Sequence, residues 1–144
     1  MKEMFIKLLA CTRAMSMYYQ HIHWTSKNSL SFQDHLLAER LYGEVGSEID
    51  GIAEKSIGVT KDASCVDLSL NIKLIGDKIN TLPMMAKENA EMFKAALMME
   101  QEFIACCTQY EKTPGITLGF QNMLAGMADH AEGRVYLLQQ RINK

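Results

Sequence analysis

Residues 21–55 have the sequence HIHWTSKNSLSFQDHLLAERLYGEVGSEIDGIAEK, in which a short polar break separates two helical stretches. The break lies at residues 26–29 (SKNS), where Asn28 can adopt the left-handed backbone conformation that ends many helices. Ser31 followed three residues later by Asp34 resembles a capping box at the start of the second helix. So short a connection predicts that the two helices are antiparallel neighbours.

The second helix, which we expect to run from Ser31 to about Gly58, has an unusual stripe. Residues recurring at steps of three and four mark one face of a helix, which we expect to point inward. Charged residues and glycines occupy positions where a core helix usually has leucine. The stripe consists of Phe32, Leu36, Glu39, Gly43, Gly46, Asp50, Ala53 and Ile57.

Three further long helices are predicted by apolar periodicity. The first runs from about residue 3 to 26, the third follows Pro83, and the fourth reaches Ile142. Their stripes are Phe5, Leu8, Cys11 or Thr12, Met15, Tyr19 and Ile22; then Met92, Ala96, Met99, Phe103, Cys106 and Tyr110; then Phe120, Leu124, Met127, Ala131, Val135, Leu138 and Ile142. Residues 59–82 predict a short connecting helix that crosses the bundle. Four long helices with one long crossover predict a single all-α, ferritin-like domain over residues 1–144.

Composition excludes several classes of protein. A formal net charge of −2 over 144 residues favours neither nucleic acid nor an acidic membrane surface as a partner. No long apolar run follows Met1–Phe5, so we expect neither a signal peptide nor a membrane span.

The sulfur-containing residues are expected to have structural roles. Few cysteines and no export signal predict a cytoplasmic protein with reduced thiols. No other sulfur or histidine is close in sequence to the adjacent Cys106 and Cys107, which disfavours a metal site there. Cys11 and Cys65 are expected to behave as small hydrophobes, and the methionines as flexible packing residues.

Five side chains that can bind metal recur at helical spacings: His23, His35, Glu39, Asp50 and Glu54. His35 and Glu39 are four residues apart and share a helix face, and Asp50 and Glu54 repeat that spacing. The step from Glu39 to Asp50 returns almost to the same stripe. His23 lies near the end of the first helix, across the short turn, where it can join His35.

One helix cannot bring both pairs to the same metal ion. His35 and Asp50 are fifteen residues apart, which is about 22 Å along a helix. Bonds from ligand to metal are only about 2 Å long. Two copies of the chain can complete a site if their second helices are antiparallel, because His35 and Glu39 of one copy then meet Asp50 and Glu54 of the other.

The twofold axis of such a pair would pass between Glu44 and Val45. Gly43 and Gly46 flank that point, and their missing side chains would allow the helices to approach closely. Because a twofold interface is self-complementary, each dimer would hold two equivalent sites.

Imidazoles and carboxylates without thiolates suit iron, manganese or zinc. Taken singly, each histidine is better explained as a structural residue, and each carboxylate as part of a solvated helix face. The occurrence of all five residues at matching helical spacings favours a metal site. We expect His21 at a surface or interface, and His130, near Asp129 and Glu132, to be exposed, since no Glu-x-x-His motif accompanies it.

These spacings resemble those of the Dps family, the mini-ferritins. The family has a His-Trp pair at the end of its first helix, a His twelve residues later, a carboxylate after four more, an Asp after eleven and a Glu after four. Here these positions hold His23-Trp24, His35, Glu39, Asp50 and Glu54. The sequence DGIAEK at residues 50–55 is also similar to the family's Asp-x-x-Ala-Glu-Arg.

The chain departs from the family pattern at four positions. Glu39 stands where Asp is usual, Asn28 where the turn usually has Gly, and Lys55 where Arg is usual. The aromatic residue usually found four residues before the second His is Phe32, three residues before His35.

The resemblance implies oxidation of Fe(II) between two subunits. His23, His35 and Glu39 would come from one subunit, and Asp50 and Glu54 from its mate. It also implies that dimers assemble into a hollow twelve-chain shell that stores ferric mineral, with hydrogen peroxide or dioxygen as oxidant. Trp24, with Tyr42, would lie near the iron and intercept stray oxidising equivalents.

Two alternatives remain at this point. The chain could be a ferritin-like structural or interaction protein that holds no redox metal, or that holds zinc passively. A nucleoid-condensing role is disfavoured, because only Lys2 and Lys7 occupy the first ten residues, where some family members have a lysine-rich tail.

Overall fold

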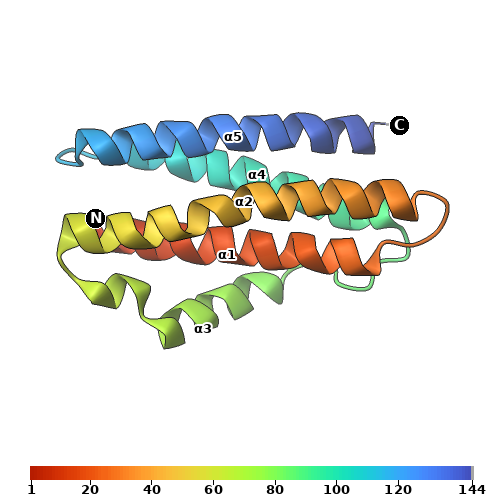
Figure 1. Cartoon of the computed structure of the whole chain (residues 1–144), viewed down its shortest axis with the longest axis horizontal. Coiled ribbons are helices and arrows are strands. Elements are labelled where there is room, and N and C mark those ends of the chain that lie inside the picture. Colours follow the sequence, from red (N-terminus) through yellow and green to blue (C-terminus); the bar gives the residue numbers. More distant parts are fainter. Residues whose placement is uncertain (144) are drawn as a thin grey trace.

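The computed structural model describes residues 1–143, in which all regular structure is helical (Figure 1). The elements are α1 (Lys2–Thr25), α2 (Ser31–Thr60), the 3-10 turn η1 (Ala63–Val66), α3 (Leu68–Ile79), α4 (Asn89–Glu111) and α5 (Leu118–Ile142). The pairs α1–α2 and α4–α5 form the bundle, and α3 packs outside it against α1. The predicted ferritin-like four-helix bundle with a short connecting helix is therefore confirmed.

The core is built from the predicted apolar stripes of α1, α4 and α5. Phe5 of α1 stacks on Phe120 of α5, with 4.2 Å between ring centroids, and so joins the two helix pairs. Of the alternatives Cys11 and Thr12, Thr12 is the buried one, and its hydroxyl donates to the carbonyl of Leu8. Each large apolar side chain buried here stabilises the fold by about 1.5–3 kcal/mol.

The ends of α2 differ in part from expectation. Asn28 has a φ of 70°, as predicted for the turn, but the helix continues to Thr60, with Lys61 (φ 58°) as its cap, and does not end at Gly58. The predicted capping box is wrong, because no side-chain hydrogen bond caps α2. Asp34 is instead buried, where it accepts hydrogen bonds from Arg141 Nε (2.7 Å) and Asn89 Nδ2 (2.8 Å).

The long third helix, α4, begins at Asn89 and not directly after Pro83. The carbonyls of the intervening loop are used by side chains of α1. Tyr18 Oη donates to Pro83 O (2.7 Å), and His21 Nε2 donates to Met84 O (2.6 Å). His21 is therefore half-buried against this loop, which differs from the surface or interface position expected for it.

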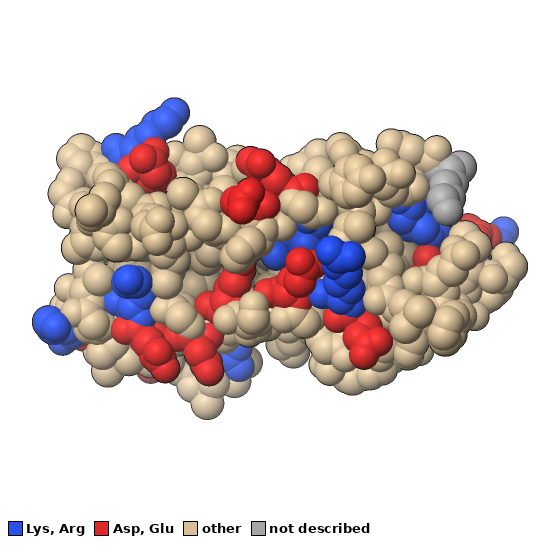
Figure 2. Space-filling view, turned by 45° about the horizontal axis from the view of Figure 1, so that its top comes forward, with Lys and Arg blue, Asp and Glu red and all other residues tan. Residues whose placement is uncertain are grey.

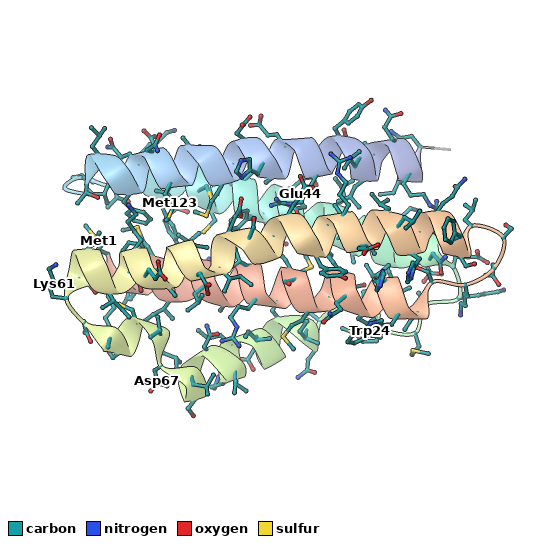
Figure 3. The ribbon with its side chains drawn as sticks, viewed as in Figure 1. Met1, Trp24, Glu44, Lys61, Asp67 and Met123 are labelled. Carbon is teal, nitrogen blue, oxygen red and sulfur yellow. The ribbon has the colours of Figure 1, made fainter. Side chains whose placement is uncertain are left out.

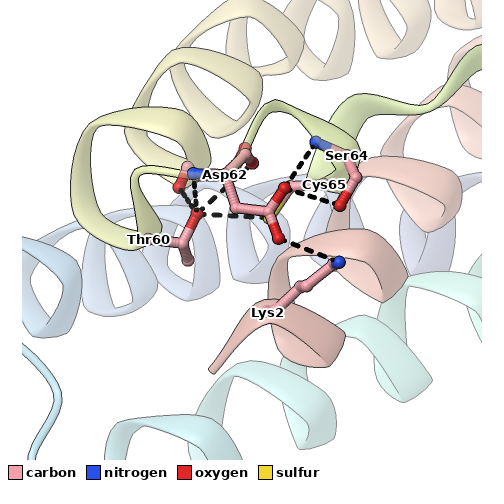
Figure 4. A network of polar contacts seen from close by, with 6 residues as sticks. Lys2, Thr60, Asp62, Ser64 and Cys65 are labelled. Atoms are coloured by element: carbon pink, nitrogen blue, oxygen red, sulfur yellow. Dashed lines mark hydrogen bonds and ion pairs between the residues drawn. The ribbon is translucent and has the colours of Figure 1, made fainter.

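The crossover between α2 and α3 is tied to the start of α1 by Asp62 (Figure 4). Its carboxylate accepts hydrogen bonds from the amide and hydroxyl of Ser64 and from Lys2 Nζ at 3.0 Å. The bonds from Ser64 and Lys2 lower the pKa of Asp62 to about 2. The amide of Asp62 in turn donates to Thr60 Oγ1 at the end of α2.

Candidate metal centre

The unusual stripe of α2 points away from the bundle, so its predicted inward direction is wrong. The side chains that α2 buries are Asp34, Ala38, Leu41, Val45, Ile52 and Ser56. Phe32, by contrast, is 71% exposed, and Glu39 and Asp50 are exposed as well. Periodicity identified the face correctly, but a face of charges and glycines cannot form the core of an isolated bundle. The stripe is therefore a surface on which another molecule can pack.

His23 and His35 are held face to face across the α1–α2 turn. Their rings stack with centroids 3.6 Å apart and planes at 21°. Each ring bonds to the backbone of the other residue, since His23 Nδ1 lies 2.8 Å from His35 O and His35 Nδ1 lies 2.8 Å from His23 O. The Tyr42 ring meets His23 edge-on at 5.4 Å.

These reciprocal bonds determine which ring nitrogens carry protons. A carbonyl oxygen can only accept a hydrogen bond, so each Nδ1 must be the donor. In the neutral imidazole the proton is then on Nδ1, and Nε2 keeps a free lone pair. Such a hydrogen bond from the non-ligating nitrogen is the usual support for a metal-binding histidine. Both side chains are therefore prepared to bind metal through Nε2.

Trp24 lies beside this pair, near the end of α1 (Figure 3). It is 69% exposed, although tryptophan side chains are on average largely buried. Together with His23, His35 and Phe32 it lines a surface depression of about 320 Å³. Exposed aromatic residues around two histidines are typical of a surface that a partner covers.

The three predicted carboxylate ligands, Glu39, Asp50 and Glu54, are all exposed on α2. Glu39 lies one helical turn beyond His35, whereas Asp50 and Glu54 lie toward the opposite end of the helix. Within residues 1–143 of a single chain, no three side chains of His, Cys, Asp or Glu converge on a position that could hold a metal ion. The structure thus brings the two histidines together but leaves the carboxylates of the second half of α2 apart from them.

The surface at the middle of α2 leaves room for another helix to pack closely against it. Glu44 lies about half-way along the helix in Figure 3. A Cβ atom added at Gly43 would meet nothing within 4 Å, and one added at Gly46 would meet only Ser16 Oγ, at 3.8 Å. Neither glycine is therefore required by packing inside the subunit.

The interior of the bundle holds an ion pair that the sequence did not predict. Arg134 Nε lies 2.6 Å from Glu100 Oε1, and Tyr19 Oη donates to the same oxygen at 2.7 Å. Both charged side chains are fully buried, and this burial raises the pKa of Glu100. The guanidinium occupies the space between α1, α4 and α5, so the bundle interior offers no cation site there.

His130 is exposed, as expected, and its Nδ1 contacts Glu48 Oε1 at 2.7 Å. Glu48 belongs to α2, so this contact bridges α2 and α5. Burial raises the pKa of Glu48. Acidic side chains gather near the middle of the face formed by α2 and α5, with basic side chains among them (Figure 2).

None of the helices described for residues 1–143 combines the length and apolar character needed to cross a bilayer.

Comparison with known proteins supports the architecture. No family model matches the sequence, and no curated protein matches it significantly. Among solved structures, the chain is similar to the X-ray structure of Dps from Thermosynechococcus elongatus, with a TM-score of 0.85 and 19% sequence identity. The superposition covers 99% of this chain and 90% of that chain. At this identity the similarity establishes a Dps-like fold.

Proposed function

We propose that two copies of this chain, each a single ferritin-like domain, pair through the outward face of α2 and oxidise Fe(II) at two equivalent sites. The observation that carries the proposal is the His23–His35 pair, whose reciprocal hydrogen bonds leave both Nε2 atoms free to bind metal. The pair is half-buried at the surface beside the α1–α2 turn and is not part of the bundle core. The Dps-like fold supports the proposal, because Dps has the same bundle.

Each site would combine groups from both chains. In an antiparallel pair of α2 helices, His35 and Glu39 of one chain lie opposite Glu54 and Asp50 of the other. His23 joins the first set through its stacked position on His35. The exposure of all three carboxylates, and the open surface around the centre of α2, are compatible with this pairing.

The ligand set suits Fe(II) as a substrate. Two neutral imidazoles and three carboxylates supply nitrogen and oxygen donors for one or two ferrous ions, with positions left for an oxidant. Carboxylates bind Fe(III), the harder cation, more strongly than Fe(II), so they favour oxidation. With hydrogen peroxide, two Fe(II) and two protons yield two Fe(III) and two water molecules.

Trp24 and Tyr42 would protect the protein during this reaction. Both aromatic rings lie beside the histidine pair, Tyr42 in edge-on contact with His23 and Trp24 in the adjoining depression. Each can donate one electron to a stray oxidising species. Fe(III) would then pass to a mineral core, which requires that dimers assemble into a closed shell.

The replacement of His35 and Glu39 by alanine tests the enzymatic part of the proposal. We expect the double variant to lose rapid Fe(II) oxidation, measured by the absorbance of ferric species after addition of ferrous ion and peroxide. Its helical circular dichroism should be unchanged, because Glu39 is exposed and half-buried His35 packs at the edge of the bundle, outside the apolar core. Replacement of His130 and Glu132, which are exposed on α5, is the matched control and should leave the initial rate intact.

Unchanged oxidation kinetics in the His35/Glu39 variant would remove the ferroxidase proposal. The chain would then be better described as a ferritin-like interaction protein. Metal analysis of the purified protein would then distinguish a metal-free protein from one that binds zinc passively, because only the second would contain zinc.

A further inference from the structure

A second cavity, of about 370 Å³, lies between α1 and α4, and its walls are rich in sulfur. Cys11 and Met15 line it from α1, and Met99 and Cys106 line it from α4. Cys11 precedes His23 by twelve residues, about 18 Å along α1, so this cavity is separate from the proposed iron site.

The helical spacing explains why the four sulfur atoms share one cavity. Cys11 and Met15 are four residues apart, and Met99 and Cys106 are seven apart, so each pair lies on one face of its helix. Met15 and Met99 are only 1% and 4% exposed, whereas the two cysteines are half-buried. The thioethers therefore lie deep in the structure, and the thiols lie nearer the opening.

We propose that this cavity binds a soft, d10 metal ion, Cu(I) in particular, through Cys11 and Cys106. Thiolate and thioether donors select Cu(I) over the harder ions that imidazole and carboxylate sites bind. Ions of this class accept two thiolates in linear coordination, so two cysteines are sufficient. The thioethers of Met15 and Met99 are the additional soft donors.

The charges around the cavity are compatible with this occupant. Two thiolates and one Cu(I) carry a net charge of −1, and Lys7 and Lys78 both line the cavity. Lys78 also forms an ion pair with Glu102, with Nζ and Oε2 2.8 Å apart. Glu102 also lines the cavity, so Lys78 partly neutralises a carboxylate there, and Lys7 remains as the second positive charge beside the thiols.

Binding must displace protons. Burial, together with the neighbouring Cys106, raises the pKa of the Cys11 thiol. One Cu(I) and two thiols then give a bis-thiolate complex and two protons. No electron is transferred.

The test is an anaerobic titration of the reduced full-length chain with Cu(I) in competition with bicinchoninate. We expect the wild-type chain to remove one equivalent of Cu(I) from the chelator, and the Cys11→Ser/Cys106→Ser variant to remove none. Cys65→Ser is the matched control, because Cys65 lies elsewhere, beside Thr60 at the end of α2, and it should bind like wild type. Met99→Leu should bind with an affinity weakened by about 10-fold, with unchanged stoichiometry.

A second measurement uses only the wild-type chain and so does not depend on the folding of variants. One equivalent of Cu(I) should protect Cys11 and Cys106 from alkylation by iodoacetamide, as mapped by mass spectrometry, and should leave the labelling of Cys65 unchanged. Equal labelling of Cys11 and Cys106 with and without Cu(I) would overturn the proposal. Stoichiometric binding by the double serine variant would do the same.

Discussion

Arg134 and Glu100 form an ion pair in the bundle interior, and the loss of either charge should have a large effect on stability. Neither side chain has exposed surface, and their charges compensate each other at 2.6 Å. Removing one partner of a fully buried pair leaves the other charge without compensation, which typically costs about 3–5 kcal/mol. We therefore expect Arg134→Met to lower the free energy of unfolding by an amount of this order, measured by urea denaturation.

The same substitution should make stability depend on pH. Burial already raises the pKa of Glu100, and loss of the Arg134 guanidinium would raise it further. A carboxyl group whose pKa is raised in the folded state binds its proton on folding, so stability falls as the pH rises above the unfolded-state value of about 4.5. The defect of Arg134→Met should accordingly be larger at pH 8 than at pH 4.5, and a defect independent of pH would contradict this explanation.

Some features of the candidate metal ligands could be predicted from the sequence, and others could not. The spacing of His35, Glu39, Asp50 and Glu54 was sufficient to place them along one helix face. The reciprocal bonds of the His23–His35 pair were not predictable, because each depends on the position of a backbone carbonyl across the turn. The Glu100–Arg134 pair was also missed, because a charged residue within an apolar stripe gives no indication of its partner.

Among the helices, α2 is the one for which the prediction depended most on what packs against it. Its periodic stripe was identified from sequence, but its direction was not, since periodicity defines a face without saying what packs on it. The start of α4 was missed for a different reason. Pro83 is compatible with a first helical turn, but Tyr18 and His21 bind the carbonyls of the loop that follows, and this tertiary effect outweighs the local preference.

Gly43→Arg tests whether the outward face of α2 is an interface. The position is open within the subunit, so arginine should be tolerated and should stabilise the helix by a few tenths to about 1 kcal/mol relative to glycine. At a close helix crossing the same side chain would prevent pairing. We expect light scattering to give the mass of a single chain for this variant and a larger mass for wild type.

Gly133→Arg is the control for this experiment, because Gly133 is an exposed glycine of α5 with equally open surroundings. It should retain the wild-type mass. If Gly43→Arg also assembled like wild type while remaining folded, the pairing of α2 helices through this point would be wrong.

For the whole molecule, the fold was the most predictable feature. The bundle follows from apolar stripes and loop lengths, and these features are compatible with very different sequences, as the TM-score of 0.85 at 19% identity illustrates. Assembly is harder to predict, because the proposed interface consists of residues that look like ordinary surface when each is considered alone. Phe32 and Trp24 are examples, since both are exposed in the single chain but have the character of interface residues.

The most direct measurement is complementation between two inactive variants, His35→Ala/Glu39→Ala and Asp50→Ala/Glu54→Ala. A mixed dimer would contain one intact site, formed by the histidine half of one chain and the carboxylate half of the other, and one site that lacks both halves. After unfolding and refolding together in equal amounts, the two variants should recover about one quarter of wild-type Fe(II) oxidation, because half of the dimers are mixed and each has one of two sites. Each variant refolded alone should remain inactive. A mixture as inactive as its components, in which mass spectrometry detects mixed dimers, would contradict a site shared between two chains.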